Sequence, residues 1–137
     1  MLRFPLIHPP LLRALAAAGH GSQVLIADAN YAHATNINPR AELVHLNLRP
    51  GLINSDDVLE TLLAAVPVEA AHVMATDDGS TPKVWPLYAR HLDTELNPLP
   101  RNDFYAACRA DSLAVCIASG DQRLYANLLL TIGVVTG

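Results

Sequence analysis

A histidine between two glycines, and an aspartate at the end of an apolar run, are the residues of this chain best suited to chemistry. Gly19-His20-Gly21 is followed by the apolar run Val24-Leu25-Ile26-Ala27, which leads directly into Asp28. An imidazole exchanges a proton near neutral pH, and a carboxylate accepts hydrogen bonds from hydroxyl groups. We expect a strand over this run, with His20 and Asp28 brought to one rim of a sheet.

A second polar group lies near the other terminus of the chain. Tyr125 and Asn127 come just before the apolar run Leu128-Leu129-Leu130, and Gly120 lies shortly before them. A phenol hydroxyl and an amide at the edge of a strand can both donate and accept hydrogen bonds. The two segments together suggest a sugar site, although such residues are also common in ordinary turns and helix ends.

Length and composition predict a single domain over residues 1–137 that associates with copies of itself. The length of 137 residues is close to the commonest domain size. The chain is 51% apolar and only 16% charged, against about 25% charged residues in a typical soluble domain. Its net charge is −4 and its nine basic residues are scattered, which argues against nucleic acid as a partner.

Cysteine usage and hydropathy predict a cytoplasmic protein. Cys108 and Cys116 are the only two cysteines, and neither belongs to a paired metal-binding motif. The first eight residues contain no long apolar stretch with a cleavage site, and no apolar run reaches the roughly 18 residues that a membrane span needs. We therefore expect no membrane partner.

Apolar spacing predicts an alternation of helices and strands. Pro9-Pro10 can open a first helix that Gly19 ends, and Ser55 is the expected N-cap of a second. Helices are predicted over residues 9–18, 55–66, 84–92 and 103–110, and strands over 22–27, 43–46, 70–75 and 113–118. Residues 128–135 are expected to form a last strand or another buried element. Residues 97–100 interrupt the pattern. This order favours a layered α/β domain with a largely parallel sheet flanked by helices.

The order and spacing of these motifs resemble the fucose mutarotase and ribose pyranase family over most of the chain. The matching segments are Gly19-His20-Gly21, Ile26-Ala27-Asp28-Ala29, Gly120, Tyr125-Ala126-Asn127, Leu128-Leu129-Leu130 and Gly133-Val134. Trp85, Tyr88 and the Phe104-Tyr105 pair before Arg109 are nearer to the fucose branch. The chain departs from that branch at Ser22, at Tyr31-Ala32-His33 and at Glu69, where an aspartate is usual.

The resemblance implies an L-fucose mutarotase, which interconverts the α and β anomers of a sugar without a cofactor. His20 would be the acid-base catalyst, and the implied substrate-binding residues are Asp28, Tyr105, Arg109, Tyr125 and Asn127. It also implies a ring-shaped homo-oligomer, commonly a decamer, with each site at a subunit junction. A D-ribose pyranase, which interconverts pyranose and furanose rings, and a non-catalytic monosaccharide-binding protein are the alternatives.

Several residues suit a structural role as well as a functional one. Arg109 suits either a substrate contact or a salt bridge between subunits, and Trp85 and Tyr88 suit the core or an interface as well as stacking on a sugar. His33 lies in the polar loop over residues 30–40, which could cover a site. The remaining histidines lack metal-ligand spacing; they are His8, His45, His72 and His91.

Other enzyme classes find no support in the sequence. The carboxylate pairs Asp56-Asp57 and Asp77-Asp78 could resemble a glycosidase site, but one suits the first turn of a helix and the other a hydrophilic loop. The sequence Gly19-His20-Gly21 lacks the spacing of a dinucleotide-binding motif, and no phosphate-binding loop motif occurs. We therefore expect neither a metal nor a nucleotide.

Overall fold

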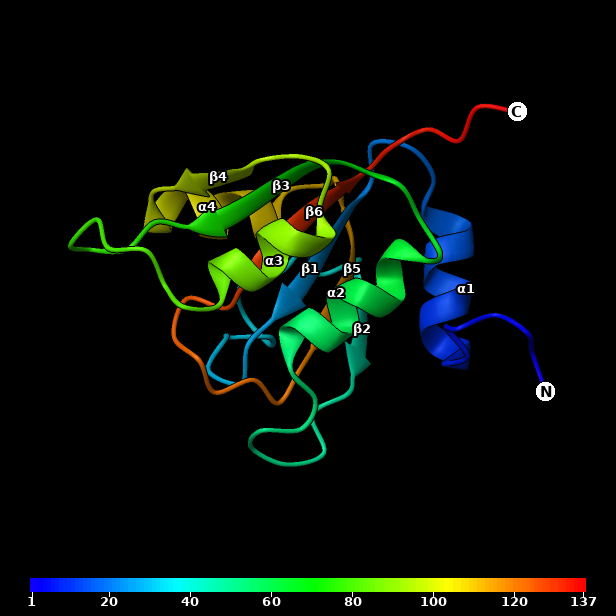
Figure 1. Ribbon diagram of the computed structural model, residues 1–137, viewed down its shortest axis with the longest axis horizontal. Coiled ribbons are helices and arrows are strands. Elements are labelled where there is room, and N and C mark those ends of the chain that lie inside the picture. Colours follow the sequence, from blue (N-terminus) through cyan, green and yellow to red (C-terminus); the bar gives the residue numbers. More distant parts are fainter.

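The computed structural model describes residues 1–137 and contains one six-stranded sheet in the order β2-β5-β1-β6-β3-β4. The strands are β1 (Gln23–Ala27), β2 (Glu42–His45), β3 (Val68–Met74), β4 (Leu96–Leu99), β5 (Leu113–Ala118) and β6 (Leu128–Ile132). β6 pairs antiparallel with both β1 and β3, while all other pairs are parallel (Figure 1). The sheet is therefore mixed rather than purely parallel, because this one strand runs against the other five.

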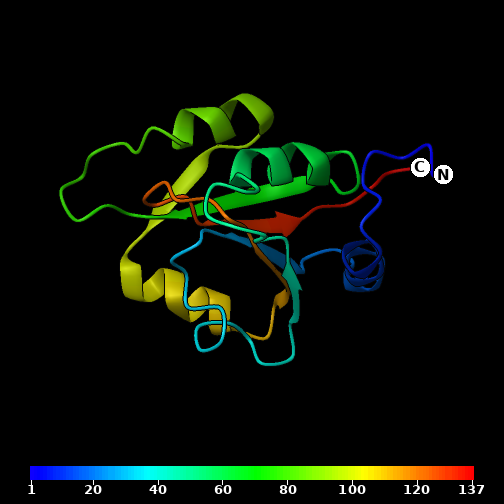
Figure 2. The ribbon, with the colours of Figure 1, turned by 90° about the horizontal axis from the view of Figure 1, so that it is seen from below.

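The four helices cover both faces of the sheet. They are α1 (Pro9–Ala18), α2 (Ser55–Leu63), α3 (Trp85–His91) and α4 (Arg101–Arg109). Figure 2 shows α2 and α3 together on one side of the sheet and α4 on the opposite side. The predicted α/β layering is confirmed.

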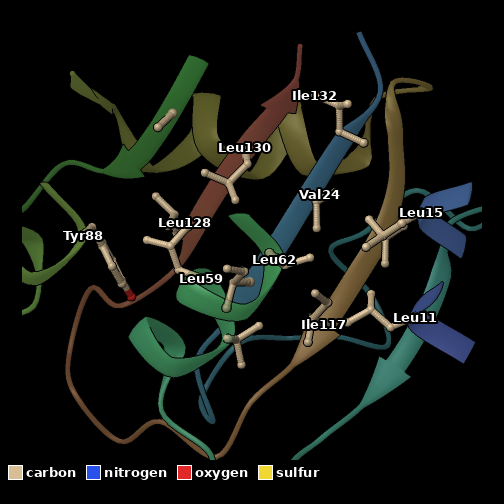
Figure 3. Packing of buried hydrophobic residues seen from close by; sticks show 14 of the residues in the cluster. Leu11, Leu15, Val24, Leu59, Leu62, Tyr88, Ile117, Leu128, Leu130 and Ile132 are labelled. Atoms are coloured by element: carbon tan, nitrogen blue, oxygen red, sulfur yellow. The ribbon is translucent and has the colours of Figure 1, made fainter. Parts of the chain in front are cut away.

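Alternate residues of the central strands supply two hydrophobic clusters. Val24 and Ile26 of β1 point into the larger cluster with residues of α1, α2 and α3, as Figure 3 shows for Val24. Leu25 and Ala27 point to the other face and pack with Phe104 of α4. Both faces of β1 are thus buried, which explains why its sequence is a continuous apolar run.

Two local predictions differ from the structure for identifiable reasons. Asn54 is the N-cap of α2, and Ser55 is its first residue, where the hydroxyl lies 3.3 Å from that of Ser119. Residues 96–99 form β4 although Pro98 lacks an N–H, since β4 is an edge strand and one of its sides needs no partner. No helix of this fold combines the length and apolar character that crossing a bilayer requires.

Candidate functional site: a cleft at one edge of the sheet

The polar residues of the candidate site meet where five strands end and β6 begins. Asp28 directly follows β1, and Asn127 directly precedes β6, which is the neighbour of β1 in the sheet. The Asp28 backbone N–H donates to Asn127 Oδ1 at 2.8 Å, and Asn127 Nδ2 donates to the Asp28 carboxylate at 3.0 Å. Two residues 99 positions apart in the sequence are thereby locked together at the sheet edge.

Tyr125 is held beside this pair by the first residues of α3. Its backbone lies in the left-handed region, with φ of 59°, which turns the chain sharply before β6. Trp85 Nε1 donates to the Tyr125 carbonyl at 3.2 Å, and the Tyr88 hydroxyl donates to the carbonyl of Ala126. Within this chain, Trp85 and Tyr88 therefore support the turn that carries Tyr125 and Asn127.

A cleft of about 300 Å³ opens over these side chains. It is lined by Asp28, Asn30, Tyr31, Met74, Arg101, Tyr105, Leu124, Tyr125 and Asn127. Four of the predicted substrate-binding residues thus share one cavity, drawn from the end that follows β1, from α4 and from the segment before β6. A larger hollow of about 590 Å³ adjoins the cleft and shares Leu124 and Tyr125 with it.

Arg101 and Asp77 are polar residues of this edge that sequence reasoning missed. Arg101 lines the cleft one helical turn before Tyr105, and its guanidinium lies 3.3 Å from the carboxylate of Asp77. The Tyr125 hydroxyl also points to Asp77, at 3.5 Å. Arg101 and Tyr105 are four residues apart and share one face of α4, but the helix predicted from the sequence begins at Asp103, so this spacing gave no signal for Arg101.

Burial makes the Asp28 carboxyl harder to ionise. Desolvation raises the pKa of Asp28, and the nearby negative charge of Asp121 raises it further. Hydrogen bonds from the backbone of Asn30 and Tyr31 and from the Asn127 side chain oppose this effect. The cleft therefore contains a carboxyl group whose proton affinity is higher than that of an exposed aspartate.

Arg109 and His33 lie beside the cleft rather than in it. Arg109 is exposed one turn beyond Tyr105, and its guanidinium donates to Asn36 Oδ1 at 2.8 Å. His33 is half-buried in the neighbouring loop, where desolvation and then the charge of His45 lower its pKa. Neither residue lines the cavity formed by this one chain.

His20 lies at the opposite edge of the sheet from the cleft. The expectation that His20 and Asp28 share one rim is wrong, because His20 precedes β1 and Asp28 follows it. The five residues of β1 alone span roughly 17 Å. At its own edge, His20 Nε2 lies 3.1 and 3.3 Å from the two carboxylate oxygens of Glu69. One copy of the chain therefore carries the cleft and the histidine at separate ends.

The turn that leads to Tyr125 is anchored by a buried carboxylate. Asp121 is fully buried and accepts hydrogen bonds from the Ser55 backbone N–H at 2.9 Å and from the Arg123 guanidinium. Desolvation opposes its ionisation, but the hydrogen bonds from Arg123 and Ser55 prevail and lower the pKa of Asp121. Arg123 also bonds Asp56 of α2, so the network ties α2 to the cleft.

We expect Asp121→Asn to destabilise the protein at neutral pH by about 1–3 kcal/mol, since it weakens charge-assisted hydrogen bonds while Arg123 stays partly solvated. Because the folded-state pKa is lowered, the stability from Asp121 is present above about pH 4 and is lost as the pH falls through the folded value. Urea unfolding at pH 7 and pH 3 gives the free energy of unfolding of both proteins. The difference in this free energy between wild type and Asp121→Asn should be smaller at pH 3 than at pH 7. An equal difference at both pH values would contradict the stabilising role of the ionised Asp121 carboxylate.

No group of three or more His, Cys, Asp or Glu side chains is placed to hold a metal ion. The two cysteines are buried free thiols, Cys108 in α4 and Cys116 in β5, and burial raises the pKa of Cys108 to about 11. Neither thiol lines the cleft, whose polar side chains carry carboxylate, phenol, amide and guanidinium groups.

Comparison with known proteins shows relatives along the whole chain. A D-ribose pyranase from Paracidovorax citrulli is 34% identical over 134 residues, which cover 98% of each chain. A fucose mutarotase from Homo sapiens is 30% identical over 95% of this chain and 90% of that protein.

Solved structures show the same fold. The fucose mutarotase of Streptococcus pneumoniae, in complex with L-fucose, has a TM-score of 0.83 and 29% identity, over 99% of this chain and 100% of the other. RbsD of Bacillus subtilis, complexed with D-ribose, has a TM-score of 0.86 and 23% identity over the same shares. The RbsD / FucU transport protein family matches residues 1–135, and this chain belongs to that family.

Proposed function

We propose that the protein is a cofactor-independent sugar isomerase whose leading reaction is the exchange of the α and β anomers of L-fucose. The observation that carries this proposal is the locked Asp28–Asn127 pair in a cleft that also holds Tyr105 and Tyr125. Carboxylate, amide and phenol groups over an aromatic surface suit a ring that bears several hydroxyls. The structural similarity to a fucose mutarotase that binds L-fucose supports the same reading.

The reaction requires two proton transfers and no redox step. One proton leaves the anomeric hydroxyl, the bond from the anomeric carbon to the ring oxygen breaks, and one proton reaches the ring oxygen. The open-chain aldehyde then recloses on either face, and both transfers are reversed. We assign His20 as the acid-base group because imidazole exchanges protons near neutral pH. Asp28, Tyr125 and Asn127 would hold the sugar hydroxyls, with Tyr105 and Arg101 beside them.

The separation of His20 from the cleft requires a second copy of the chain for catalysis. A contact between the His20 edge of one copy and the cleft edge of the next joins unlike surfaces, and such contacts close into rings when the rotation allows it. The low charge content and exposed apolar residues, such as Phe4, Leu52 and Val135, are consistent with extensive contacts between copies. We propose a ring-shaped homo-oligomer, with a decamer as the expected size.

D-ribose is the second candidate substrate. The 34% identity with a D-ribose pyranase, over nearly the full length of both chains, favours it. The same residues would serve, since ring opening of a pyranose and reclosure as a furanose need the same two proton transfers. Selection between the sugars would then depend on how the cleft and the neighbouring copy enclose the ring.

Saturation-transfer NMR on L-fucose, with D-ribose in parallel, tests the function at neutral pH with catalytic amounts of protein. Transfer of magnetisation between fucose anomers supports the mutarotase. Transfer between ribose pyranose and furanose forms alone would move the assignment to a pyranase. Shifted or broadened sugar signals without any transfer would instead identify a monosaccharide-binding protein.

Mixed oligomers test whether the site lies between two copies. We expect His20→Ala and Asn127→Ala to be inactive separately but to regain activity after they are dissociated together and reassembled. If each site combines the two edges, random mixing gives about one junction in four with both edges intact. Rates from saturation transfer should therefore approach about a quarter of wild type. No recovery, with mixed assembly confirmed by native mass spectrometry, would contradict a shared site.

A further inference from the structure

The larger hollow beside the cleft has not yet been given a role. It measures about 590 Å³, against about 300 Å³ for the cleft, and Leu124 and Tyr125 line both. Arg101, which lines the cleft, lies 3.3 Å from Asp77, which lines the hollow. The two cavities are therefore neighbours across a boundary of side chains, and a molecule bound in the cleft has room to extend into the hollow.

One wall of the hollow is the segment between β3 and α3, which Figure 2 shows extending away from the sheet. Hydrogen bonds within this segment fix its conformation. The Thr76 hydroxyl donates to the Ser80 carbonyl at 2.8 Å, and the Ser80 N–H donates to the Asp78 carboxylate at 3.0 Å. On the opposite wall, the Trp85 side chain holds the Tyr125 carbonyl at 3.2 Å. The hollow is therefore largely formed before a ligand binds, as small-molecule sites usually are.

The charges around the hollow are nearly balanced. Arg123 is paired with two carboxylates of its own network, and Asp77 is paired with Arg101. The Lys83 ammonium and the Asp78 carboxylate remain as lining groups of opposite charge without an ion pair. A phosphate group would gain little here, because it would meet the carboxylate as well as the ammonium. Hydroxyl groups can instead donate to Asp78 and accept from Lys83, which favours an uncharged ligand with several hydroxyls.

Leu124 gives the boundary between the two cavities an apolar surface. It is 71% exposed, although it lies between two cavities with many polar lining groups. A sugar ring presents C–H groups on its faces and hydroxyls around its edge. An aliphatic side chain beside the Tyr125 phenol, with polar groups around them, suits both parts of such a ring.

We propose that the larger hollow is a second sugar subsite, which binds an uncharged glycosyl group attached to the sugar in the cleft. This inference rests on the proposed function and extends its substrate class from free monosaccharides to reducing disaccharides. Only the reducing ring opens and recloses, by the two proton transfers given above. The second ring keeps its glycosidic bond and contributes binding alone.

Galactosyl disaccharides linked at O2, O3 or O4 of L-fucose test the subsite on the assembled protein. Saturation of the methyl protons of the protein, followed by transfer to the ligand, reports which sugar protons lie against the protein. We expect both rings of at least one disaccharide to receive saturation. Saturation confined to the fucose ring in every disaccharide would overturn the proposal whether or not exchange occurs, because this measurement needs no catalysis.

The kinetics of anomer exchange give the second measurement. We expect the KM of the best disaccharide to be about tenfold lower than that of L-fucose, which corresponds to one added set of contacts. If D-ribose rather than L-fucose undergoes exchange, the same disaccharides built on D-ribose give this comparison. A KM equal to or above that of the free monosaccharide for every disaccharide would contradict a second subsite.

Ser80→Trp tests the location of the second ring, because Ser80 lines the larger hollow and not the cleft. The bulky indole should raise the KM of the best disaccharide about tenfold, while kcat and KM for the monosaccharide stay within about twofold. Thr94→Trp is the matched control, since Thr94 lines a separate hollow of about 540 Å³ at the other end of α3. Lys83→Met removes a donor at similar length and should raise the disaccharide KM about threefold.

Assembly of each variant is checked by its elution volume before kinetics. An equal rise in KM for both sugars in Ser80→Trp would place its effect on the cleft and overturn the second subsite. Exchange of the monosaccharide with exclusion of every disaccharide would retain the proposed function and reject this inference alone. Tighter binding of D-ribose 5-phosphate than of any disaccharide would identify an anion site and overturn the assignment of an uncharged ligand.

Discussion

His20→Ala should reduce anomer exchange by about 10² to 10⁴ while sugar binding is partly retained. The cleft that holds Asp28, Tyr125 and Asn127 does not include His20, so removing the imidazole leaves those contacts in place. Saturation transfer at several sugar concentrations gives kcat and KM, and line broadening of the sugar signals gives affinity. The expected pattern is a large fall in kcat with a small change in KM.

His91→Ala is the matched control for this substitution. His91 is exposed as the last residue of α3 and does not line the cleft, so its removal should leave exchange unchanged. Unchanged exchange in His20→Ala would remove His20 from catalysis. If His20→Ala loses both exchange and assembly, the mixed oligomers distinguish the two causes. In them a wild-type His20 edge from another copy should restore exchange.

The strands of the sheet could be predicted because burial on both faces produces continuous apolar runs. Residues 113–118 and the run before Asp28 were predicted within a residue of β5 and β1. β4 could not be predicted, since Pro98 argues against a strand until its place at the sheet edge is known. The direction of β6 could not be predicted from the sequence either, because a buried strand has the same composition whether its neighbours run parallel or antiparallel to it.

The site was predictable where its residues adjoin strand ends. Asp28 and Asn127 abut apolar runs, and strand neighbours bring such ends together. Arg101 carries no such signal, because its role depends on where the start of α4 lies relative to the cleft. Glu69 lay just before the strand predicted over residues 70–75 and was noted only as a departure from the fucose branch, so its contact with His20 comes from the structure alone.

The error over His20 has a simple geometric origin. A residue before a strand and a residue after it lie at opposite edges of the sheet, however close they are in sequence. In the proposed ring, the cleft edge of one copy would meet the His20 edge of the next, which would account for polar residues at both edges of one chain.

Gly120→Ala should destabilise the fold by more than about 3 kcal/mol or prevent folding, which is the largest stability effect we expect from a single methyl group. A Cβ at Gly120 would lie 1.8 Å from the Leu52 carbonyl oxygen and 2.5 Å from that of Arg49. Both obstacles are backbone atoms, which a rotamer change cannot move. The Gly120 N–H also donates to Ile53 at 3.0 Å, and its carbonyl accepts from Gly51 at 2.7 Å, so the two segments cannot separate without losing both bonds.

The consequence would reach the cleft, because Asp121 follows Gly120 and its carbonyl accepts the Ala29 N–H at 2.8 Å, next to Asp28. Urea unfolding followed by circular dichroism measures the loss. Gly133→Ala is the matched control for stability, since its Cβ would meet nothing closer than 3.4 Å, and that neighbour is the Glu69 side chain. Equal stability of the two variants would contradict the close packing of Gly120. If instead only Gly120→Ala unfolds at a lower urea concentration than wild type, the close packing of residues 49–53 against the segment after β5 stabilises the cleft edge.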